Sequence, residues 1–356
     1  MDYVKLKDVC TINMGQSPSS DSYNENGHGV PFFQGNADFG ERYPVTRKWC
    51  SAPTKMAAPE DILISVRAPI GAMNYAKEEC CIGRGLAALT PNREKVAPEY
   101  IFWLLKGKNE ELNCKGTGST FKAIGRNILE ETLVPNISLE KQTECAIILE
   151  KTYRVILSRN QQLQKLDELV KARFVELFGD PELNPRGLPV LPWNAVFLTT
   201  TGKLDSNAMV ENGRYPFFTC AKESYKIDSY AFDCEALLLA GNNAAGIYDV
   251  KHYKGKFNAY QRTYVLRLMN EKWSYILFKR QLEDKLQYLQ SQSKGTNTRY
   301  LTLGILNELR FVVPPVAEQE QFAVFVEQTD KSKVAVQKAL DEAQLLFDSL
   351  MQKYFW

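Results

Sequence analysis

The feature that most constrains the fold is a pair of long helical segments, 140–178 and 318–356, which carry matching apolar stripes. In the first segment an apolar residue recurs at every seventh position from Leu149 to Leu177, and charged and amide side chains occupy the other faces. The second segment steps by threes and fours, with Lys333 as the single polar interruption. Such narrow stripes predict helices that pack along a partner helix. The expected seam residues are Leu149, Ile156, Leu163, Val170, Leu177, Val326, Val336, Leu340, Phe347, Leu350 and Tyr354.

Each of these two helices is predicted to be the partner of the other. One isolated stripe would favour an ordinary core helix, but here the surroundings of the stripe are repeated as well. An apolar segment ending in proline precedes each helix, at 132–135 and 311–314, and Gln142 and Gln321 follow these prolines at equal distance. Helices of about 39 residues would be roughly 58 Å long, at 1.5 Å per residue. Rods of that length extend beyond the width of a small domain.

The segments before the two helices are predicted to be two similar domains of mixed α/β structure. Both contain short apolar runs bounded by Gly, Pro and Asn, which is typical of strands and turns. The same short motifs recur in the same order, although pairwise identity is low. The expected correspondences are Leu6, Val9 and Gly15 with Trp193, Val196 and Gly202, residues 31–33 with 216–218, residues 61–64 with 235–238, residues 100–102 with 275–277, and the loop 115–122 with the loop 294–299.

The predicted fold class is α+β, with two similar mixed α/β domains separated by two long antiparallel helices that form a coiled coil. The order implies an internal pseudo-two-fold symmetry. The expected boundaries are 1–138 for the first domain, 139–178 for the first helix, 179–189 for a linker, 190–314 for the second domain and 315–356 for the second helix. Symmetric dimers suit palindromic DNA sites, so two diverged domains in one chain would suit two different half-sites at a fixed gap.

Composition excludes several classes of protein. The chain is 44% hydrophobic and 24% charged, which is ordinary for a soluble protein. No apolar run approaches the roughly 18 residues of a membrane span, and the start lacks the apolar core of a signal peptide, so a cytoplasmic location is expected. The eight cysteines form no C-x-x-C pair and are interpreted as reduced structural thiols. Segment 190–313 has a modest basic excess, which permits nucleic acid binding without requiring it.

The sequence lacks the motifs of an enzyme that would act on DNA alone. It has no G-x-x-x-x-G-K-[ST] phosphate loop and no Asn/Asp-Pro-Pro-Tyr/Phe run of the kind that amino-methyltransferases use. The run Glu283, Asp284, Lys285 resembles a nuclease fragment but has no Pro-Asp upstream, so no metal site is predicted. His28 and His252 are expected to have surface or phosphate-facing roles.

This duplicated order resembles the specificity subunit of type I restriction-modification enzymes, over essentially the full length of the chain. The resemblance rests on the junctions 135–142 and 314–321 and on the segments 118–122 and 295–299. It implies a non-catalytic subunit that recognises bipartite double-stranded DNA, one part per target-recognition domain. It also implies that the subunit holds two modification (methyltransferase) subunits and, in the full enzyme, motor-nuclease subunits. No cofactor is expected on this chain, with S-adenosylmethionine, ATP and Mg on partner subunits.

Base recognition in DNA uses mainly Arg or Lys on guanine and Asn or Gln on adenine. Polar residues on expected loops of this kind are candidates, although ordinary solvation or turn formation explains any single one equally well. A coiled-coil scaffold that binds only protein and a stand-alone DNA-modifying enzyme are the alternative interpretations. The candidate DNA-binding residues are Gln16, Ser17, Gln34, Arg67, Lys115, Thr117, Ser119 and Lys122 in the first domain, and Lys203, Asn242, Asn243, Arg262, Lys294, Thr296, Asn297 and Arg299 in the second.

Overall fold

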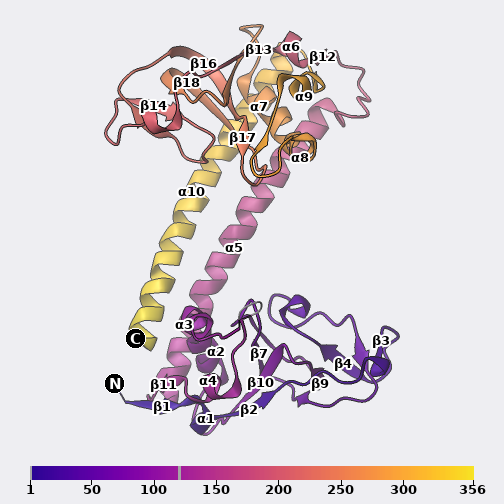
Figure 1. Ribbon diagram of the computed structural model, residues 1–356, viewed down its shortest axis with the longest axis vertical. Coiled ribbons are helices and arrows are strands. Elements are labelled where there is room, and N and C mark those ends of the chain that lie inside the picture. Colours follow the sequence, from indigo (N-terminus) through magenta and orange to yellow (C-terminus); the bar gives the residue numbers. More distant parts are fainter. Residues whose placement is uncertain (1, 119–121) are drawn as a thin grey trace. The chain divides into compact units, whose positions relative to one another are not determined.

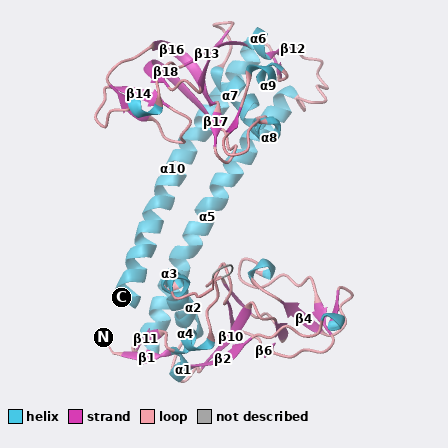
Figure 2. Ribbon diagram, viewed as in Figure 1, coloured by secondary structure: helices cyan, strands magenta, loops and turns pink. Residues whose placement is uncertain are grey.

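The computed structural model describes residues 2–118 and 122–356, which divide into two compact units (Figure 1). Unit 1 contains Met1–Asn160 and Lys338–Trp356, and unit 2 contains Gln161–Gln337. Strands and helices are mixed in each unit, as Figure 2 shows. The candidate Ser119 lies outside the described residues.

Unit 1 is built on a four-stranded antiparallel sheet, in the order β2-β10-β7-β8, and a five-stranded mixed sheet, in the order β3-β5-β4-β9-β6. A short antiparallel pair, β1 and β11, lies beside the start of the long helix α5. The strands are β1 Tyr3–Lys5, β2 Cys10–Met14, β3 Tyr23–Asn24, β4 Val30–Phe33, β5 Trp49–Cys50, β6 Met56–Ala57, β7 Ile62–Ser65, β8 Met73–Tyr75, β9 Cys80–Ile82, β10 Leu86–Pro91 and β11 Leu133–Pro135. The short helices are α1 Leu6–Val9, η1 Ser20–Ser22, η2 Asn36–Asp38, α2 Pro98–Gly107, α3 Asn109–Cys114 and α4 Arg126–Glu130.

Unit 2 repeats this plan with one larger sheet, in the order β13-β19-β16-β18-β14-β15, and two antiparallel pairs, β12 with β21 and β17 with β20. Its strands are β12 Val190–Pro192, β13 Phe197–Thr201, β14 Tyr215–Phe218, β15 Tyr225–Ile227, β16 Phe232–Ala240, β17 Asn242–Asn243, β18 Val250–Ala259, β19 Thr263–Leu268, β20 Arg299–Tyr300 and β21 Arg310–Val312. Its short helices are α6 Trp193–Val196, η3 Ser206–Ala208, α7 Tyr275–Asp284, α8 Leu286–Gln292 and α9 Leu303–Asn307.

The two long helices are α5 (Leu139–Phe178) and α10 (Val316–Phe355), each of 40 residues. In unit 1 the first part of α5 packs with the last part of α10, where Trp103 of α2 contacts Tyr153 and Phe347 edge-on at centroid distances of 5.2 and 5.6 Å. In unit 2 the last part of α5 packs with the first part of α10, and the rings of Phe174 and Phe322 lie 5.7 Å apart. The predicted pairing of the two helices is therefore confirmed.

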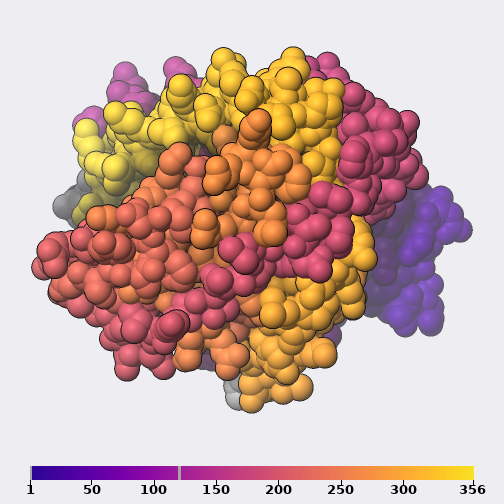
Figure 3. Space-filling model, turned by 90° about the horizontal axis from the view of Figure 1, so that it is seen from above, coloured from indigo at the N-terminus to yellow at the C-terminus, as the bar shows by residue number. Residues whose placement is uncertain are grey.

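The seam residues are all at least partly shielded from solvent. Leu149, Ile156, Val170 and Phe347 are buried, and the others have intermediate exposure. The polar interruption at Lys333 has a local explanation, because its ammonium group lies 2.7 Å from Asp167 of α5 and 3.6 Å from Asp330. In Figure 3 the yellow surface of α10 borders the orange surface of the neighbouring part of unit 2.

Two of the correspondences expected between the halves are confirmed. The helices α1 and α6 begin at Leu6 and Trp193, after strands of the same length. The segments 31–33 and 216–218 lie in β4 and β14, which pair in parallel with β9 and β18. Their phenylalanines are buried, as expected for core residues rather than for base-stacking ones.

The expected correspondence of 61–64 with 235–238 is wrong by one residue. Ile62 pairs with Leu89, and Leu237 pairs with Leu266 at the same place in the second sheet. Ile62 therefore corresponds to Leu237 and not to Ala236. A shift by one residue moves every side chain of a strand to the other face of the sheet. The two faces have separate cores here, with Leu237 in one and Ala236 in the other.

The expected correspondence of 100–102 with 275–277 is wrong by two residues. The helices α2 and α7 have equal lengths and begin at Pro98 and Tyr275. Tyr100 therefore corresponds to Leu277, and both are fully buried. The shared Tyr-Ile pair in the two segments is a coincidence of sequence.

The expected equivalence of Gln142 and Gln321 is wrong, because the structural counterpart of Gln142 is Gln319. The Gln142 amide oxygen accepts a hydrogen bond from the Ala97 N–H at 2.9 Å, and that of Gln319 accepts one from the Ser274 N–H at 3.0 Å. Ala97 and Ser274 are the N-cap residues of α2 and α7. Gln142 and Gln319 are buried and Gln321 is exposed, so each long helix is joined to its domain by one buried glutamine.

Candidate nucleic-acid interface

A tight turn between β9 and β10 of unit 1, residues 83–86, is the centre of a group of exposed polar side chains. The Leu86 N–H closes the turn by donating to the Gly83 oxygen at 3.0 Å. The turn is also bonded to its neighbours, because the Gly83 N–H donates to Phe33 and the Val66 N–H donates to Gly85. These bonds bring the segments that follow β4 and β7 to either side of the turn.

Glycines allow the backbones around this turn to touch. A Cβ atom at Gly15 would lie 2.2 Å from the Gly83 oxygen, and one at Gly85 would lie 2.4 Å from the Gln34 oxygen. Only a residue without a side chain fits at such distances. Gln16 directly follows Gly15, and Gln34 supplies the oxygen that Gly85 approaches; both glutamines are exposed.

The ends of a second loop, residues 117–118 and 122–123, join the same group. Thr117 and Ala123 exchange backbone hydrogen bonds there, with the Thr117 N–H donating to Ala123 at 3.0 Å and the Ala123 N–H donating to Thr117 at 2.9 Å. Ala123 also forms a bridge with Arg67, which follows β7. Arg67 and Lys122 are exposed. We call Gln16, Gln34, Arg67, Arg84 and Lys122, together with the turn 83–86 and the loop ends 117–118 and 122–123, the unit 1 cluster.

Unit 2 builds the same arrangement from different residues. In the turn 260–263 between β18 and β19, the Thr263 N–H donates to Tyr260 at 2.8 Å, and the Tyr260 N–H donates to Phe218 at 2.9 Å. The Gly241 N–H donates to Arg262 at 2.8 Å, as Val66 does to Gly85 in unit 1. A Cβ atom at Gly202 would lie 1.8 Å from the Ala259 oxygen.

The second loop is repeated as well, at residues 294–300. Lys294 and Tyr300 exchange backbone hydrogen bonds of 3.1 and 2.8 Å, as Thr117 and Ala123 do. In both loops a glycine with positive φ directly follows the first hydrogen-bonded residue. Gly118, after Thr117, has a φ of 125°, and Gly295, after Lys294, has a φ of 99°. We call Lys203, Asn242, Gln261, Arg262 and Arg299 with the loops 260–263 and 294–300 the unit 2 cluster.

The structure thus brings most of the described candidates together within each unit. Thr117, Lys294, Thr296 and Asn297 are exposed on the second loops, and Arg67 and Asn242 occupy equivalent positions beside them. Arg299 follows in β20, where its Nη1 donates to the Gln290 oxygen at 3.4 Å. Lys203 corresponds to Gln16, one residue after the crowded glycine in each unit.

Three candidates have structural roles that compete with DNA contact. The Ser17 hydroxyl accepts from the Arg84 N–H at 3.3 Å, and the Asn243 side-chain oxygen accepts from the N–H groups of Ala245 and Ile247. Lys115 forms an ion pair with Glu111 at 2.5 Å. Hydrogen bonds from Lys115 and Lys108 lower the pKa of Glu111.

Sequence reasoning missed two exposed residues at the tips of the turns, Arg84 and Gln261. Arg84 stands between Gly83 and Gly85, and this glycine-flanked arginine is a signal of a tight turn that the sequence does contain. Gln261 has no such signal. Its position becomes visible only when the pairing of β14 with β18 is known.

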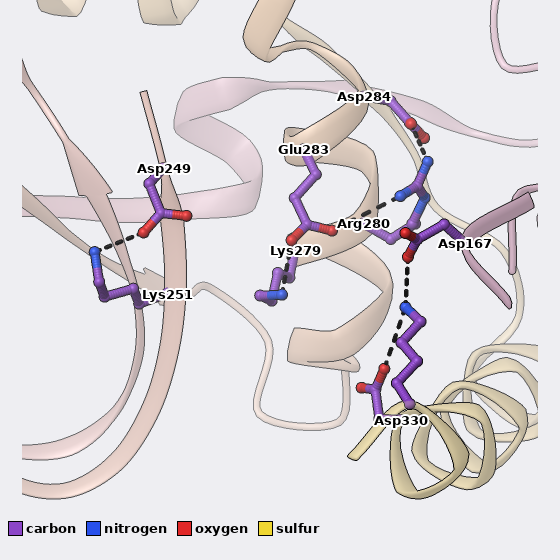
Figure 4. A network of polar contacts seen from close by, with 9 residues as sticks. Asp167, Asp249, Lys251, Lys279, Arg280, Glu283, Asp284 and Asp330 are labelled. Carbon is purple, nitrogen blue, oxygen red and sulfur yellow. Dashed lines mark hydrogen bonds and ion pairs between the residues drawn. The ribbon is translucent and has the colours of Figure 1, made fainter. Parts of the chain in front are cut away.

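Unit 2 also contains a hollow of about 760 Å³ whose lining includes none of the described candidate DNA-binding residues. It is lined by residues of α5, α7, β18 and α10, many of them charged, and Figure 4 shows ion pairs among charged side chains in and beside this hollow. Lys251 pairs with Asp249 at 2.6 Å, and Lys279 pairs with Glu283 at 2.7 Å. Arg280 pairs with Asp284. These paired side chains therefore have a structural role.

The other groups that the sequence singled out, Glu283, Asp284 and His252, have partners within unit 2. Glu283 and Asp284 are held by Lys279 and Arg280, and burial raises the pKa of Asp284. His252 lies 2.9 Å from Glu235, and its ring stacks on Tyr275. All eight cysteines are free thiols. Within residues 2–118 and 122–356 no group of His, Cys, Asp and Glu could hold a metal ion, and no helix of that part is long and apolar enough to cross a membrane.

Comparison with known proteins gives consistent matches. The family model "Type I restriction modification DNA specificity domain" matches residues 1–168 and 196–343. The type I restriction enzyme EcoDI specificity subunit of Escherichia coli is 36% identical over 160 residues, which are 42% of this chain and 35% of that protein. The matched segment thus spans about a third of that relative.

Solved structures match in two ways. The type I restriction-modification S subunit from M. genitalium matches 100% of this chain and 96% of its own length, with a TM-score of 0.68 and 15% identity. That similarity concerns the fold. The HsdS subunit from Thermoanaerobacter tengcongensis is 45% identical over a part that covers 42% of this chain and 36% of that one, with a TM-score of 0.39.

Proposed function

The chain belongs to the family of type I restriction-modification DNA specificity domains, and from this membership we propose that it recognises a bipartite double-stranded DNA target. Each target-recognition domain, 1–138 and 190–314, contacts one half-site through its own cluster. The helical segments 139–178 and 315–356 connect the domains, with 179–189 as a linker. The chain is a cytoplasmic protein and has no catalytic role.

One observation carries the proposal. Two backbone arrangements that share the hydrogen bonds closing and supporting their turns present different polar side chains, with Gln16, Arg67 and Arg84 in unit 1. Unit 2 presents Lys203, Asn242 and Gln261 at the same positions. Arg, Lys, Asn and Gln are the side chains that form the commonest specific contacts with base edges. A repeated scaffold with changed side chains is what two different half-sites require.

The partners follow from the same proposal. Methylation needs two modification subunits, and restriction needs motor-nuclease subunits, because the chain lacks their motifs. S-adenosylmethionine, ATP and Mg are therefore bound by the partners. The candidate DNA contacts in unit 1 are Gln16, Ser17, Gln34, Arg67, Lys115, Thr117, Ser119 and Lys122, and those in unit 2 are Lys203, Asn242, Asn243, Arg262, Lys294, Thr296, Asn297 and Arg299.

The proposal is tested by selection from a randomised duplex library, with the chain alone and with added modification subunits. The proposal predicts that the complex enriches one motif in two parts with a fixed gap. A double variant of one cluster, Arg67→Ala with Lys122→Ala, should weaken enrichment of one part only. Lys338→Ala is the matched control, because Lys338 is exposed on α10 outside both clusters. Enrichment without any sequence motif, or no retention of DNA, would support the scaffold alternative.

A further inference from the structure

The residues at the tips of the two tight turns, Arg84 and Gln261, occupy one equivalent position. Each is the first central residue of a turn that a backbone hydrogen bond closes, from Leu86 to Gly83 and from Thr263 to Tyr260. Each residue also donates its backbone N–H to the segment that follows the closely packed glycine of its unit, which is Gly15 in unit 1 and Gly202 in unit 2. Arg84 donates to the Ser17 hydroxyl at 3.3 Å, and Gln261 donates to the Leu204 oxygen at 2.9 Å.

The position is rigid at the backbone and free at the side chain. The turn in unit 1 is bonded to the segments of Phe33 and Val66, and the turn in unit 2 is bonded to those of Phe218 and Gly241. Both side chains are exposed. Neither makes a hydrogen bond or an ion pair through its side chain to any residue that the structure describes. The fixed backbone limits the entropy lost on binding to the ordering of the side chain itself, and no existing contact of that side chain has to be broken.

The two side chains differ in charge and in hydrogen-bonding groups, since a guanidinium group only donates and an amide both donates and accepts, but each can form a bidentate pair with a purine. A guanidinium group forms a bidentate pair with O6 and N7 of guanine, and a glutamine amide forms one with N6 and N7 of adenine. A contact that served mainly the phosphate charge would be weaker with Gln261, which is neutral. The exchange of Arg for Gln at one rigid position changes the purine with which the side chain can pair.

We infer that this turn position determines base specificity in both units, with Arg84 contacting a guanine in one half-site and Gln261 contacting an adenine in the other. The inference rests on the proposed DNA recognition and adds to it the residue and the base. It also explains why the turns are so closely supported. A side chain that distinguishes one base from another needs a backbone held in one place, so that only the side chain has to be ordered on the base.

The experiment exchanges the two side chains singly, as Arg84→Gln and Gln261→Arg, in the full chain assembled with modification subunits. Methylated positions are then mapped on a randomised duplex library. Arg84→Gln should change the preferred base from guanine to adenine at one position of one half-site, and Gln261→Arg should make the opposite change in the other half-site. Each preference should shift by about 5- to 150-fold, the range expected for one bidentate pair.

Arg93→Gln is the control for the first exchange. Arg93 is exposed just beyond the other end of β10, so the chemical change is the same and the place is different. This variant should keep the wild-type motif. Unchanged motifs in both exchange variants, or a loss of binding that is equal for all sequences, would overturn the inference while leaving bipartite recognition intact. A wild-type complex with no motif at all would refute the proposed function itself.

Discussion

Replacing the buried glutamine of α10, Gln319→Ala, should loosen unit 2 where the long helix joins its domain. The substitution removes two hydrogen bonds, one accepted from the Ser274 N–H at 3.0 Å and one donated to the Pro314 oxygen at 2.8 Å. Gln319 is 0% exposed, so water cannot replace the amide without entering the core. Both lost partners belong to segments that enter helices, α7 and α10.

The expected magnitude follows from these contacts. A buried polar group left without its partner costs about 1–3 kcal/mol. The higher helix propensity of Ala recovers only about a few tenths of a kcal/mol. For two partners, of which Ser274 is only partly buried, we expect a loss of about 2–4 kcal/mol in the free energy that protects unit 2 from opening.

Amide hydrogen exchange is the suitable assay, since a chain with two compact units has no single free energy of unfolding. Protection of α7 should fall about 30- to 1,000-fold, because each 1.4 kcal/mol is a factor of ten. Protection of α2 in unit 1 should stay at its wild-type value.

Gln321→Ala is the matched control, two residues further along the same helix and exposed. Surface substitutions of this kind usually change stability by less than about 0.5 kcal/mol. Equal loss of protection in both variants, or a loss only in Gln321→Ala, would refute the assignment of Gln319 as the counterpart of Gln142.

Three further predictions concern single side chains. Arg299→Ala should reduce the discrimination between bases at one position of the target by about 1–3 kcal/mol of binding free energy, whereas Lys294→Ala should weaken binding to all duplexes alike. Titration with single-base variants of the target checks both predictions, and equal losses of binding for all sequences would make Arg299 a phosphate contact. Hydrogen bonds from Arg186 lower the pKa of Glu318, so this stabilisation is complete above the ordinary pKa of Glu and disappears as pH falls through the lowered value. The amide hydrogen-exchange protection of unit 2 in Arg186→Ala and in wild type should therefore converge in acid, and a difference in protection that is constant with pH would contradict this. Burial raises the pKa of Cys10 and Cys80 to about 12, so iodoacetamide at about pH 8 should modify exposed Cys114 first; early modification of either buried thiol, seen by mass spectrometry, would count against the packing described.

The sequence alone was sufficient to align equivalent positions of the two halves where only one residue type meets the local structural requirement. Gly15 and Gly202 mark places where two backbones touch, and the Pro-Phe-Phe segments mark strands with a buried end. Gly118 and Gly295 have positive φ in equivalent loops. These residues were aligned correctly between the halves because no other residue would serve in their place.

Sequence reasoning failed where several alignments satisfied the same pattern. An apolar strand can be shifted by one residue in an alignment without changing its apolar pattern. The alignment of the two halves therefore matched Ile62 with Ala236, whereas strand pairing shows that Ile62 corresponds to Leu237. Near the start of α10 both Gln319 and Gln321 were available, and only burial distinguishes them. Arg84 and Gln261 were missed because their equivalence depends on strand pairing between segments that are far apart in sequence.

The central claim is that each unit recognises its own half of a bipartite target, and exchange of one domain tests it most directly. Residues 1–138 are replaced by the first domain of another family member, and the methylated sites of the hybrid assembled with modification subunits are sequenced. The account predicts that one half-site changes to that of the donor while the other half-site stays as in the wild type. A folded hybrid in which both half-sites change, or neither does, would contradict independent recognition by the two units.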